Sequence, residues 1–388
     1  TGVAANAGDP ILLRGTQTAD TITVEPDAGD VTDLSVTVTG GGDTVTTIYE
    51  NVVGGGASIE QVLIQAKAGE DTINVEPLDS VAVNVDGGDP IATNPNVLDG
   101  DVLNIIDSPI DIFHTQGPEP DSGSFEAVDP GTPYGPISYD EIENASVVSG
   151  DPTTDVVFGT NGDDHITVVQ VDNNGTVETH VSVNGGPPVR FIGTETDLVI
   201  NAQNGDDVIS VVSLDGTTLW NLNLTVIGGN PAASDTLVVQ TPGTDSVQYR
   251  PTGVDAGTLD VTNIGLSINI ATTELVKYDG EGGDDFIDVI GTANDERFVH
   301  TPAGAIDSGR IDTFDETNGD THLPIEYVNA GVNGTVEVSG GGGENTLVAL
   351  GTSAADFMSA FFADTDEIVI DLTSPVGDHI VLQSDVDR

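Results

Sequence analysis

The residues best suited to chemistry in this chain are aspartates in short glycine-rich turns. The stretches TNGDDHIT, QNGDDVIS and GEGGDDFID each place Asp next to a β-like run, and KAGEDTIN and TQTADTIT repeat the pattern more loosely. Such turns bring backbone carbonyls and carboxylates together, and these are the hard oxygen ligands that Ca²⁺ prefers. The candidate metal ligands are the aspartates at the matching positions, namely Asp20, Asp71, Asp164, Asp207 and Asp285.

These stretches resemble the calcium-binding repeats of the hemolysin-type, or RTX, family of large secreted bacterial surface proteins, whose consensus is GGxGxDxUx with U a large apolar residue. The resemblance implies Ca²⁺ as the cofactor. In the family the nonapeptides follow one another without interruption, whereas here tens of residues separate them. The resemblance therefore extends to metal binding at the five aspartates and not to a complete β-roll. The alternative is that these aspartates cap tight turns through Asx hydrogen bonds.

The elements that must position these turns are short strands. Runs of alternating character, such as TINVE (residues 72–76) and DVISVV (residues 207–212), recur along the chain between Gly- and Asp-rich turns. The 48 Gly and 20 Pro interrupt almost every stretch that is long enough for a helical period, and the best exception is residues 353–364. The pattern predicts an all-β protein.

The chain also repeats itself. A Gly-Thr pair followed by an acid and a β-like run occurs in GTQTADTITV from Gly15, GTNGDDHITVV from Gly159 and GTANDERFV from Gly291. A unit of strand, turn and strand cannot bury its own apolar face, so serial repetition favours stacked coils. We therefore expect repetitive β-solenoid modules, similar to a parallel β-helix, with Gly/Asp turns. The alternative is a series of tandem small β-sandwich domains.

The repeats divide the chain into three parts. Residues 1–150 form a first pair of modules, which includes a Pro/Gly-rich segment, residues 117–136, that we expect to be a protruding loop. Residues 151–290 form a second pair of modules. Residues 291–388 form a third, partial repeat.

The charge of the chain limits its partners. With 65 Asp and Glu against 8 Lys and Arg, the formal net charge is −57. Nucleic acids and anionic membrane surfaces need a basic footprint, so both are excluded as partners. No apolar run is long enough to span a membrane, so direct membrane insertion is not expected. A folded chain this acidic needs bound divalent cations or high salt to offset its self-repulsion.

Catalytic patterns are missing from the sequence. The six His residues show no H-E-x-x-H or H-x-H spacing, there is no Cys, and neither a G-x-S-x-G elbow nor a Walker loop is present. Acidic pairs are so common that their presence is uninformative. We therefore expect no enzymatic activity. A β-helical polysaccharide-degrading enzyme is the least favoured hypothesis.

Together these features predict an extracellular structural protein of the cell surface. The leading hypothesis is a subunit or segment of a filament or S-layer-like assembly that is stabilised by calcium and built by self-association into a homopolymer. The alternative is a stalk or glycan-binding module of a large secreted adhesin, with cell-surface or matrix glycans as partners. Four Asn-x-Ser/Thr sequons, at Asn144, Asn174, Asn223 and Asn333, would permit glycosylation.

Overall fold

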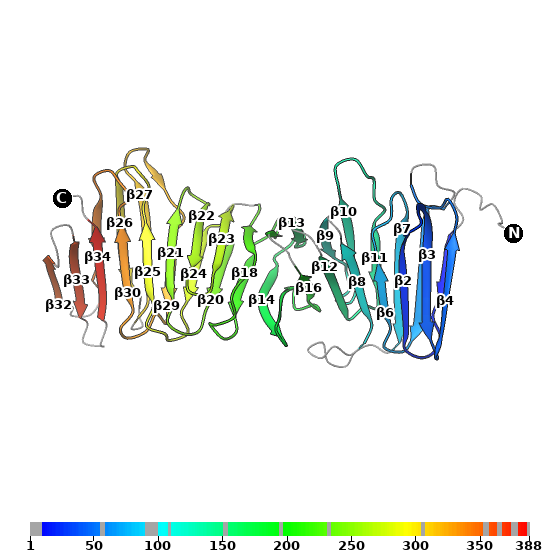
Figure 1. The fold of residues 1–388 in the computed structure, drawn as a ribbon. Helices are drawn as coiled ribbons and strands as arrows, with labels where there is room; N and C mark the ends of the chain where they lie inside the picture. Colours follow the sequence, from blue (N-terminus) through cyan, green and yellow to red (C-terminus); the bar gives the residue numbers. More distant parts are fainter. Residues whose placement is uncertain are drawn as a thin grey trace. The chain divides into compact units, whose positions relative to one another are not determined.

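The protein is a repetitive all-β structure (Figure 1). The computed structural model describes residues 10–54, 59–89, 100–107, 110–149, 154–193, 197–230, 234–303, 307–351, 357–362, 367–373 and 379–385. About 60% of the chain is in strands, and the described residues contain no helix. They therefore also contain no helix that is long and apolar enough to cross a membrane. Most strands pair in parallel with strands of neighbouring coils, which confirms the expected β-solenoid class.

Alternating side chains explain why these segments form strands. In β5 (Gln61–Ala68), the side chains of Val62, Ile64 and Ala66 are buried, and the residues between them are half-buried. The same alternation appears in β18 (Val208–Ser213). Because successive side chains of a strand point to opposite faces, each strand places one row in the core between two sheets.

The chain forms two compact units. Unit 1 comprises Thr1–Gly159 and Asn173–Leu198, and unit 2 comprises Thr160–Asp172 and Val199–Arg388. Each unit has two sheets, here called sheet A and sheet B. β17 (Asp197–Asn201) includes residues of both units. The three-part division predicted from the repeats concerns sequence modules and stays a prediction.

In unit 1, neighbouring strands of each sheet are hydrogen-bonded in an order that differs from their order in the chain. The order in sheet A is β1 (Ile11–Arg14), β5, β7 (Ala82–Asp89), β11 (Ile137–Asp140), β10 (Gly123–Val128), β9 (Asp111–Gln116) and β13 (Thr154–Phe158). The order in sheet B is β4 (Asp43–Tyr49), β3 (Asp30–Gly40), β2 (Asp20–Asp27), β6 (Thr72–Val75), β8 (Val102–Asp107), β12 (Asn144–Ser149), β16 (Val189–Gly193) and β15 (Thr176–Val183).

Unit 2 is arranged in the same way. The order in sheet A is β19 (Asn223–Ile227), β23 (Leu266–Ala271), β22 (Gly257–Val261), β21 (Ser246–Pro251), β25 (Phe286–Ile290), β30 (Thr335–Ser339), β34 (His379–Asp385), β33 (Glu367–Thr373) and β32 (Phe357–Phe362). The order in sheet B is β14 (His165–Asn173), β18, β20 (Thr236–Gln240), β24 (Leu275–Asp279), β29 (Ile325–Val328), β27 (Gly309–Asp315), β26 (Glu296–Pro302) and β31 (Thr346–Ala349), with β28 (Asp320–Thr321) paired to β27.

The sequence modules differ in length because some of them contain an antiparallel excursion. In an excursion, the chain turns back and forth once within one sheet before it continues to the other sheet. After β9, the chain returns along β10 and then runs forward again in β11, which pairs in parallel with β7. The segments β21–β22–β23 and β26–β27–β29 repeat this course in unit 2. Each excursion adds strands to one sheet and leaves the opposite sheet unchanged, so modules with and without an excursion differ in length.

Two local expectations were wrong. Residues 117–136 are not a single loop, because Gly123–Val128 forms β10 between β9 and β11. Of residues 353–364, the described part is a strand, because Phe357–Phe362 pairs antiparallel with β33. In both places, pairing with neighbouring strands overrides the local sequence signal.

Candidate functional site

The corners that lead from sheet A to sheet B explain the repeated Gly-Thr-x-x-x-acid pattern. At the first corner, the hydroxyl of Thr16 donates to Asp20 at 3.1 Å. At the equivalent corner of unit 2, the backbone N–H and the hydroxyl of Thr160 donate to Asp164 at 2.7 and 2.9 Å. A Cβ atom at Gly15 would overlap a backbone carbonyl and lie 2.9 Å from Asp20 Oδ2, so only glycine fits beneath the folded-back carboxylate.

In unit 1, the acids at successive corners form a column of hydrogen bonds between coils. The backbone N–H of Asp20 donates to Asp71 Oδ1 at 2.6 Å, and the N–H of Asp71 donates to Asp101 Oδ1 at 2.7 Å. The N–H of Asp101 then donates to Glu143 Oε2 at 2.7 Å. All four side chains are buried. We call Asp20, Asp71, Asp101 and Glu143 the unit 1 column.

Unit 2 contains a matching column. The N–H of Asp164 donates to Asp207 Oδ1 at 2.7 Å, and the N–H of Asp207 donates to Asp235 Oδ1 at 2.9 Å. The N–H of Asp235 donates to Glu274 Oε2 at 2.7 Å. These four residues are the unit 2 column. At a later corner of the same kind, the N–H of Glu296 donates to Asn345 Oδ1 at 2.9 Å.

Asp285 lies at a different type of corner, where the chain passes from sheet B back to sheet A. Its Oδ1 accepts the backbone N–H of Asp245 at 2.9 Å. The hydroxyl of Tyr278 donates to Asp245 at 3.2 Å, so a buried phenol supports this pair. The corner therefore uses a carboxylate in the same structural way as the columns do.

The surroundings of these carboxylates disfavour the charged form. The second oxygens of Asp71, Asp101, Asp207, Asp235 and Asp285 are buried and have no hydrogen-bond partner in the described structure. Burial, aided by neighbouring carboxylates, raises the pKa of Asp101 to about 7, of Asp207 to about 6 and of Asp285 to about 7. The folded protein therefore holds protons at these sites at a pH where an exposed Asp has lost its proton.

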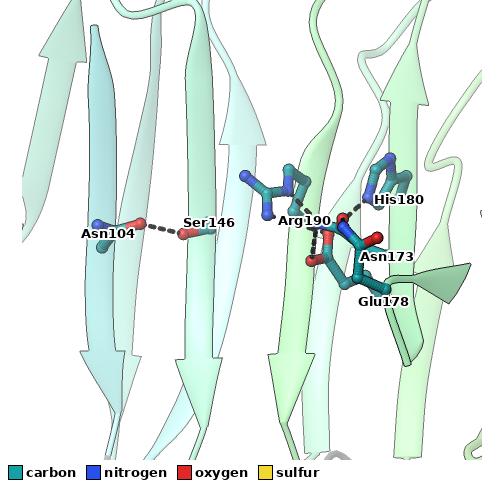
Figure 2. Close-up of polar contacts among 7 residues, drawn as sticks. Asn104, Ser146, Asn173, Glu178, His180 and Arg190 are labelled. Carbon is teal, nitrogen blue, oxygen red and sulfur yellow. Dashed lines mark hydrogen bonds and ion pairs between the residues drawn. The ribbon is translucent and has the colours of Figure 1, made fainter. Parts of the chain in front are cut away.

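A second polar row crosses the outer face of sheet B in unit 1. Asn104 Nδ2 donates to Asn74 Oδ1 at 2.9 Å, and the hydroxyl of Ser146 donates to Asn104 Oδ1 at 2.6 Å, as Figure 2 shows for the latter pair. Side chains thus connect neighbouring coils outside the core as well as at the corners.

The same figure shows an ion-pair group in unit 1. The carboxylate of Glu178 accepts hydrogen bonds from His180, Arg190 and Asn173, each at 3.0 Å (Figure 2). Burial alone would raise the pKa of Glu178, but these donors hold it below its usual value. A carboxylate that is buried, ionised and saturated with donors is poorly suited to accept a proton from a substrate.

Two other histidines are buried in the core, and each contacts a tyrosine hydroxyl. His114 Nε2 lies 2.9 Å from the Tyr139 hydroxyl, and His300 Nε2 lies 2.8 Å from the Tyr327 hydroxyl. Burial lowers the pKa of His114 to about 3 and of His300 to about 4, so both imidazoles are neutral at physiological pH. The repeated His–Tyr pair is a packing feature of the excursions in both units.

The five aspartates predicted as metal ligands do not converge on one site. Asp20 and Asp71 are neighbours in the unit 1 column, Asp164 and Asp207 are neighbours in the unit 2 column, and Asp285 lies apart from both pairs. Since Ca²⁺ takes six to eight oxygens, such pairs do not form a complete coordination shell by themselves. Binding of Ca²⁺ at these residues stays a prediction.

Within the described ranges, one other group has the spacing of a metal site. Carboxylate oxygens of Glu119, Asp121 and Asp140 all lie within 4.8 Å of one another in unit 1, and two of the three residues are exposed. Sequence reasoning did not single out these residues, because residues 119 and 121 lie before β10 and residue 140 ends β11. Their proximity depends on the excursion.

Sequence reasoning also missed several members of the columns. Asp101, Glu143 and Glu274 do not follow a Gly-Asp-Asp turn, and Asp235 belongs to a weak copy of it, PAASDTLV. Two features together would identify them. Each is an acid at the start of a strand, and that strand pairs in parallel with a strand that follows a recognised turn.

Comparisons with known proteins add no assignment. No protein-family model, no curated protein and no solved structure matches the chain. The function must therefore be inferred from the geometry.

Proposed function

We propose that this chain is a non-enzymatic structural protein of the cell exterior, a subunit or segment of a surface filament or S-layer-like assembly that calcium stabilises. The observation that carries the proposal is the pair of hydrogen-bonded carboxylate columns. The most repeated motif of the sequence is used to join one coil to the next, and the aspartates that accept these hydrogen bonds are buried away from any substrate. A stack with such connections suits a mechanical role.

The charge of the chain supports a need for cations. Two surfaces of a protein with net charge −57 repel each other unless counterions neutralise or screen them. Exposed acids are the places where a divalent cation can join two copies, and Glu119, Asp121 and Asp140 offer the closest grouping in the part of the chain that is described. Calcium in this role acts between copies, while the columns act within each copy.

An open strand supports self-association. In the described structure β4 pairs only with β3, and six of its seven residues are exposed. Val45 is 60% and Ile48 is 44% exposed, and residues 44–49 carry no charge in a chain that is otherwise rich in acids. An uncharged strand with a free edge is a template for pairing with another chain.

The buried histidines support the proposal that the protein is non-enzymatic. His114 and His300 are buried and neutral, and the Glu178 group is internally saturated. None of these groups is arranged as a nucleophile beside an accessible base.

Sedimentation velocity tests the proposal. The purified chain should shift from small to very large species in millimolar Ca²⁺ and return with excess chelator, at constant ionic strength. The triple variant Glu119→Gln, Asp121→Asn, Asp140→Asn should require more Ca²⁺ for the shift. The charge-matched triple variant Glu25→Gln, Glu60→Gln, Glu126→Gln changes three exposed acids of the same unit and should behave like the parent. A single small species under all conditions would contradict the proposal.

A further inference from the structure

Unit 2 contains a polar hollow that the structural role does not use. It has a volume of about 300 Å³ and is lined by residues from three segments, 252–254, 292–294 and 315–322. These are the turn between β21 and β22, the corner before β26, and the turn after β27. At about 30 Å³ for each water molecule, the hollow has room for about ten waters, or for one small organic molecule.

The floor of the hollow is a fixed anion. The carboxylate of Asp315 accepts the backbone N–H groups of Thr317 and Asn318, each at 2.9 Å. It also accepts the side-chain amides of Asn294 and Asn318, each at 2.8 Å. The N–H of Asn318 and the other donors lower the pKa of Asp315. Asp315 is therefore ionised, and its oxygens are already occupied.

The amides that hold Asp315 determine what the hollow offers to a ligand. Because the nitrogens of Asn294 and Asn318 donate to Asp315, their amide oxygens are left as acceptors. Asp320, an exposed residue of the lining, adds a carboxylate. The hydroxyl of Thr292 donates a hydrogen bond to Glu296 and accepts one from the backbone N–H of Asn294. The available side-chain groups are thus mainly acceptors, and the Asp320 carboxylate is the charged one.

His322 marks the buried wall. It is 5% exposed, and its Nδ1 has no hydrogen-bond partner in the described structure. Its position is fixed, because its backbone N–H donates to Thr313 O at 2.8 Å and the next N–H, of Leu323, donates to Gly253 O at 2.7 Å. His322 therefore forms a rigid wall of the hollow, and its buried Nδ1 is closed off from solvent.

We propose that the polar hollow binds a small organic cation through a primary ammonium group, with the Asp320 carboxylate and the amide oxygens of Asn294 and Asn318 as its acceptors. An ammonium group carries three donors and one positive charge, which matches this lining. The proposal is independent of the assembly role, because the hollow shares no residue with the columns or with β4.

The lining argues against other ligand classes. Among the described residues that line the hollow there is no Lys or Arg to bind an anion, and no Phe, Tyr or Trp to form a cage around a quaternary ammonium or to stack on a sugar ring. Within the same described ranges, the one trio of His, Asp and Glu ligand atoms with metal-like spacing lies elsewhere, at Glu119, Asp121 and Asp140. A bare metal ion is therefore not the occupant.

Glucosamine and glucose provide a matched pair of probes, since they share ring and hydroxyl groups but differ in the ammonium. We would follow the imidazole resonances of His322 by NMR, assigned with His322→Gln, at constant moderate salt. Glucosamine should shift them saturably at concentrations up to about 50 mM, and glucose should not. Asp320→Asn should weaken binding about tenfold or more. Glu281→Gln, which removes an equal charge from an exposed site of unit 2 outside the lining of the hollow, should leave the affinity unchanged.

Several outcomes would overturn the proposal. Equal shifts with both sugars would assign the hollow to neutral polyols, and saturable shifts with Mg²⁺ or Ca²⁺ alone would assign it to a metal. Equal weakening by Asp320→Asn and Glu281→Gln would show that glucosamine responds only to the net charge of the chain. If no probe shifts the His322 resonances, the hollow is not a binding site.

Discussion

The unit 1 column and the unit 2 column contain the same order of side chains, three aspartates and then a glutamate, but the lengths of chain between their members differ. Successive members are 51, 30 and 42 residues apart in unit 1, and 43, 28 and 39 residues apart in unit 2. The hydrogen bonds are nevertheless alike, at 2.6–2.7 Å in unit 1 and 2.7–2.9 Å in unit 2. The corner is therefore the feature that repeats, and the segments between corners vary.

The two columns also differ in where charge is least favourable. The pKa reaches about 7 at Asp101, the third member in unit 1, and about 6 at Asp207, the second member in unit 2. Burial is the main cause of the raised pKa in both columns, and neighbouring carboxylates add to it.

The largest expected effect is on the pH dependence of stability. The pKa values of Asp101, Asp207 and Asp285 are raised above the usual 3.8, so the folded protein binds more protons than the unfolded chain between about pH 4 and 7. Their contribution to the free energy of unfolding is thus present at low pH and is lost as the pH rises through the folded pKa values. The melting temperature at constant salt should fall from pH 5 to pH 8. Asp101→Asn with Asp207→Asn should flatten this profile, whereas a rising profile in the parent would contradict the column electrostatics.

Removal of a column acceptor should have the next largest effect. Asp101→Ala leaves the buried N–H of Asp71 without an acceptor and should cost about 1–3 kcal/mol in urea denaturation. Asp101→Asn keeps an acceptor oxygen and should cost little, as Asn345 already accepts the N–H of Glu296. Asp235→Ala and Asp235→Asn should show the same order in unit 2. Equal losses for Ala and Asn would mean that the hydrogen bond is not what matters.

The His–Tyr pairs allow a comparison of the excursions. Tyr139→Phe in unit 1 and Tyr327→Phe in unit 2 each leave a buried His Nε2 without its phenol partner, and each should cost about 1–2 kcal/mol. Tyr49→Phe, at the half-exposed end of β4, serves as the control and should be neutral in the same denaturation assay. A loss in only one unit would show that the two excursions are not equivalent.

The smallest effect is expected at a surface ion pair. Lys277 Nζ lies 3.9 Å from Glu326 Oε2, and both side chains are more than one-third exposed. Lys277→Gln should change the free energy of unfolding by less than about 0.5 kcal/mol, because solvent and salt screen such pairs. A larger loss would indicate that sheet B of unit 2 depends on surface charge.

Much of the fold follows from local sequence. The alternation in segments such as residues 61–68 predicts strands, and the Gly-Thr pairs mark the corners because glycine must lie beneath the carboxylate and threonine must donate to it. The excursions could not be predicted in this way. Residues 123–128 lie between Pro- and Gly-rich turns, and their pairing with β9 and β11 is a tertiary property.

The candidate sites were less predictable than the fold. The sequence identified Asp71 and Asp207 as important but not their use as hydrogen-bond acceptors between coils, because that role depends on parallel register. The polar hollow gathers residues 252–254, 292–294 and 315–322, which no local pattern connects.

Amide hydrogen exchange at the corners tests the central claim most directly. The claim is that the corner carboxylates hold neighbouring coils together through backbone N–H groups. The amides of Asp20, Asp71 and Asp101 in unit 1, and of Asp164, Asp207 and Asp235 in unit 2, should therefore exchange as slowly as those of central strands. This protection should be the same in Ca²⁺ and in excess chelator. Exchange as fast as in exposed turns, or protection that disappears with the chelator, would contradict the claim.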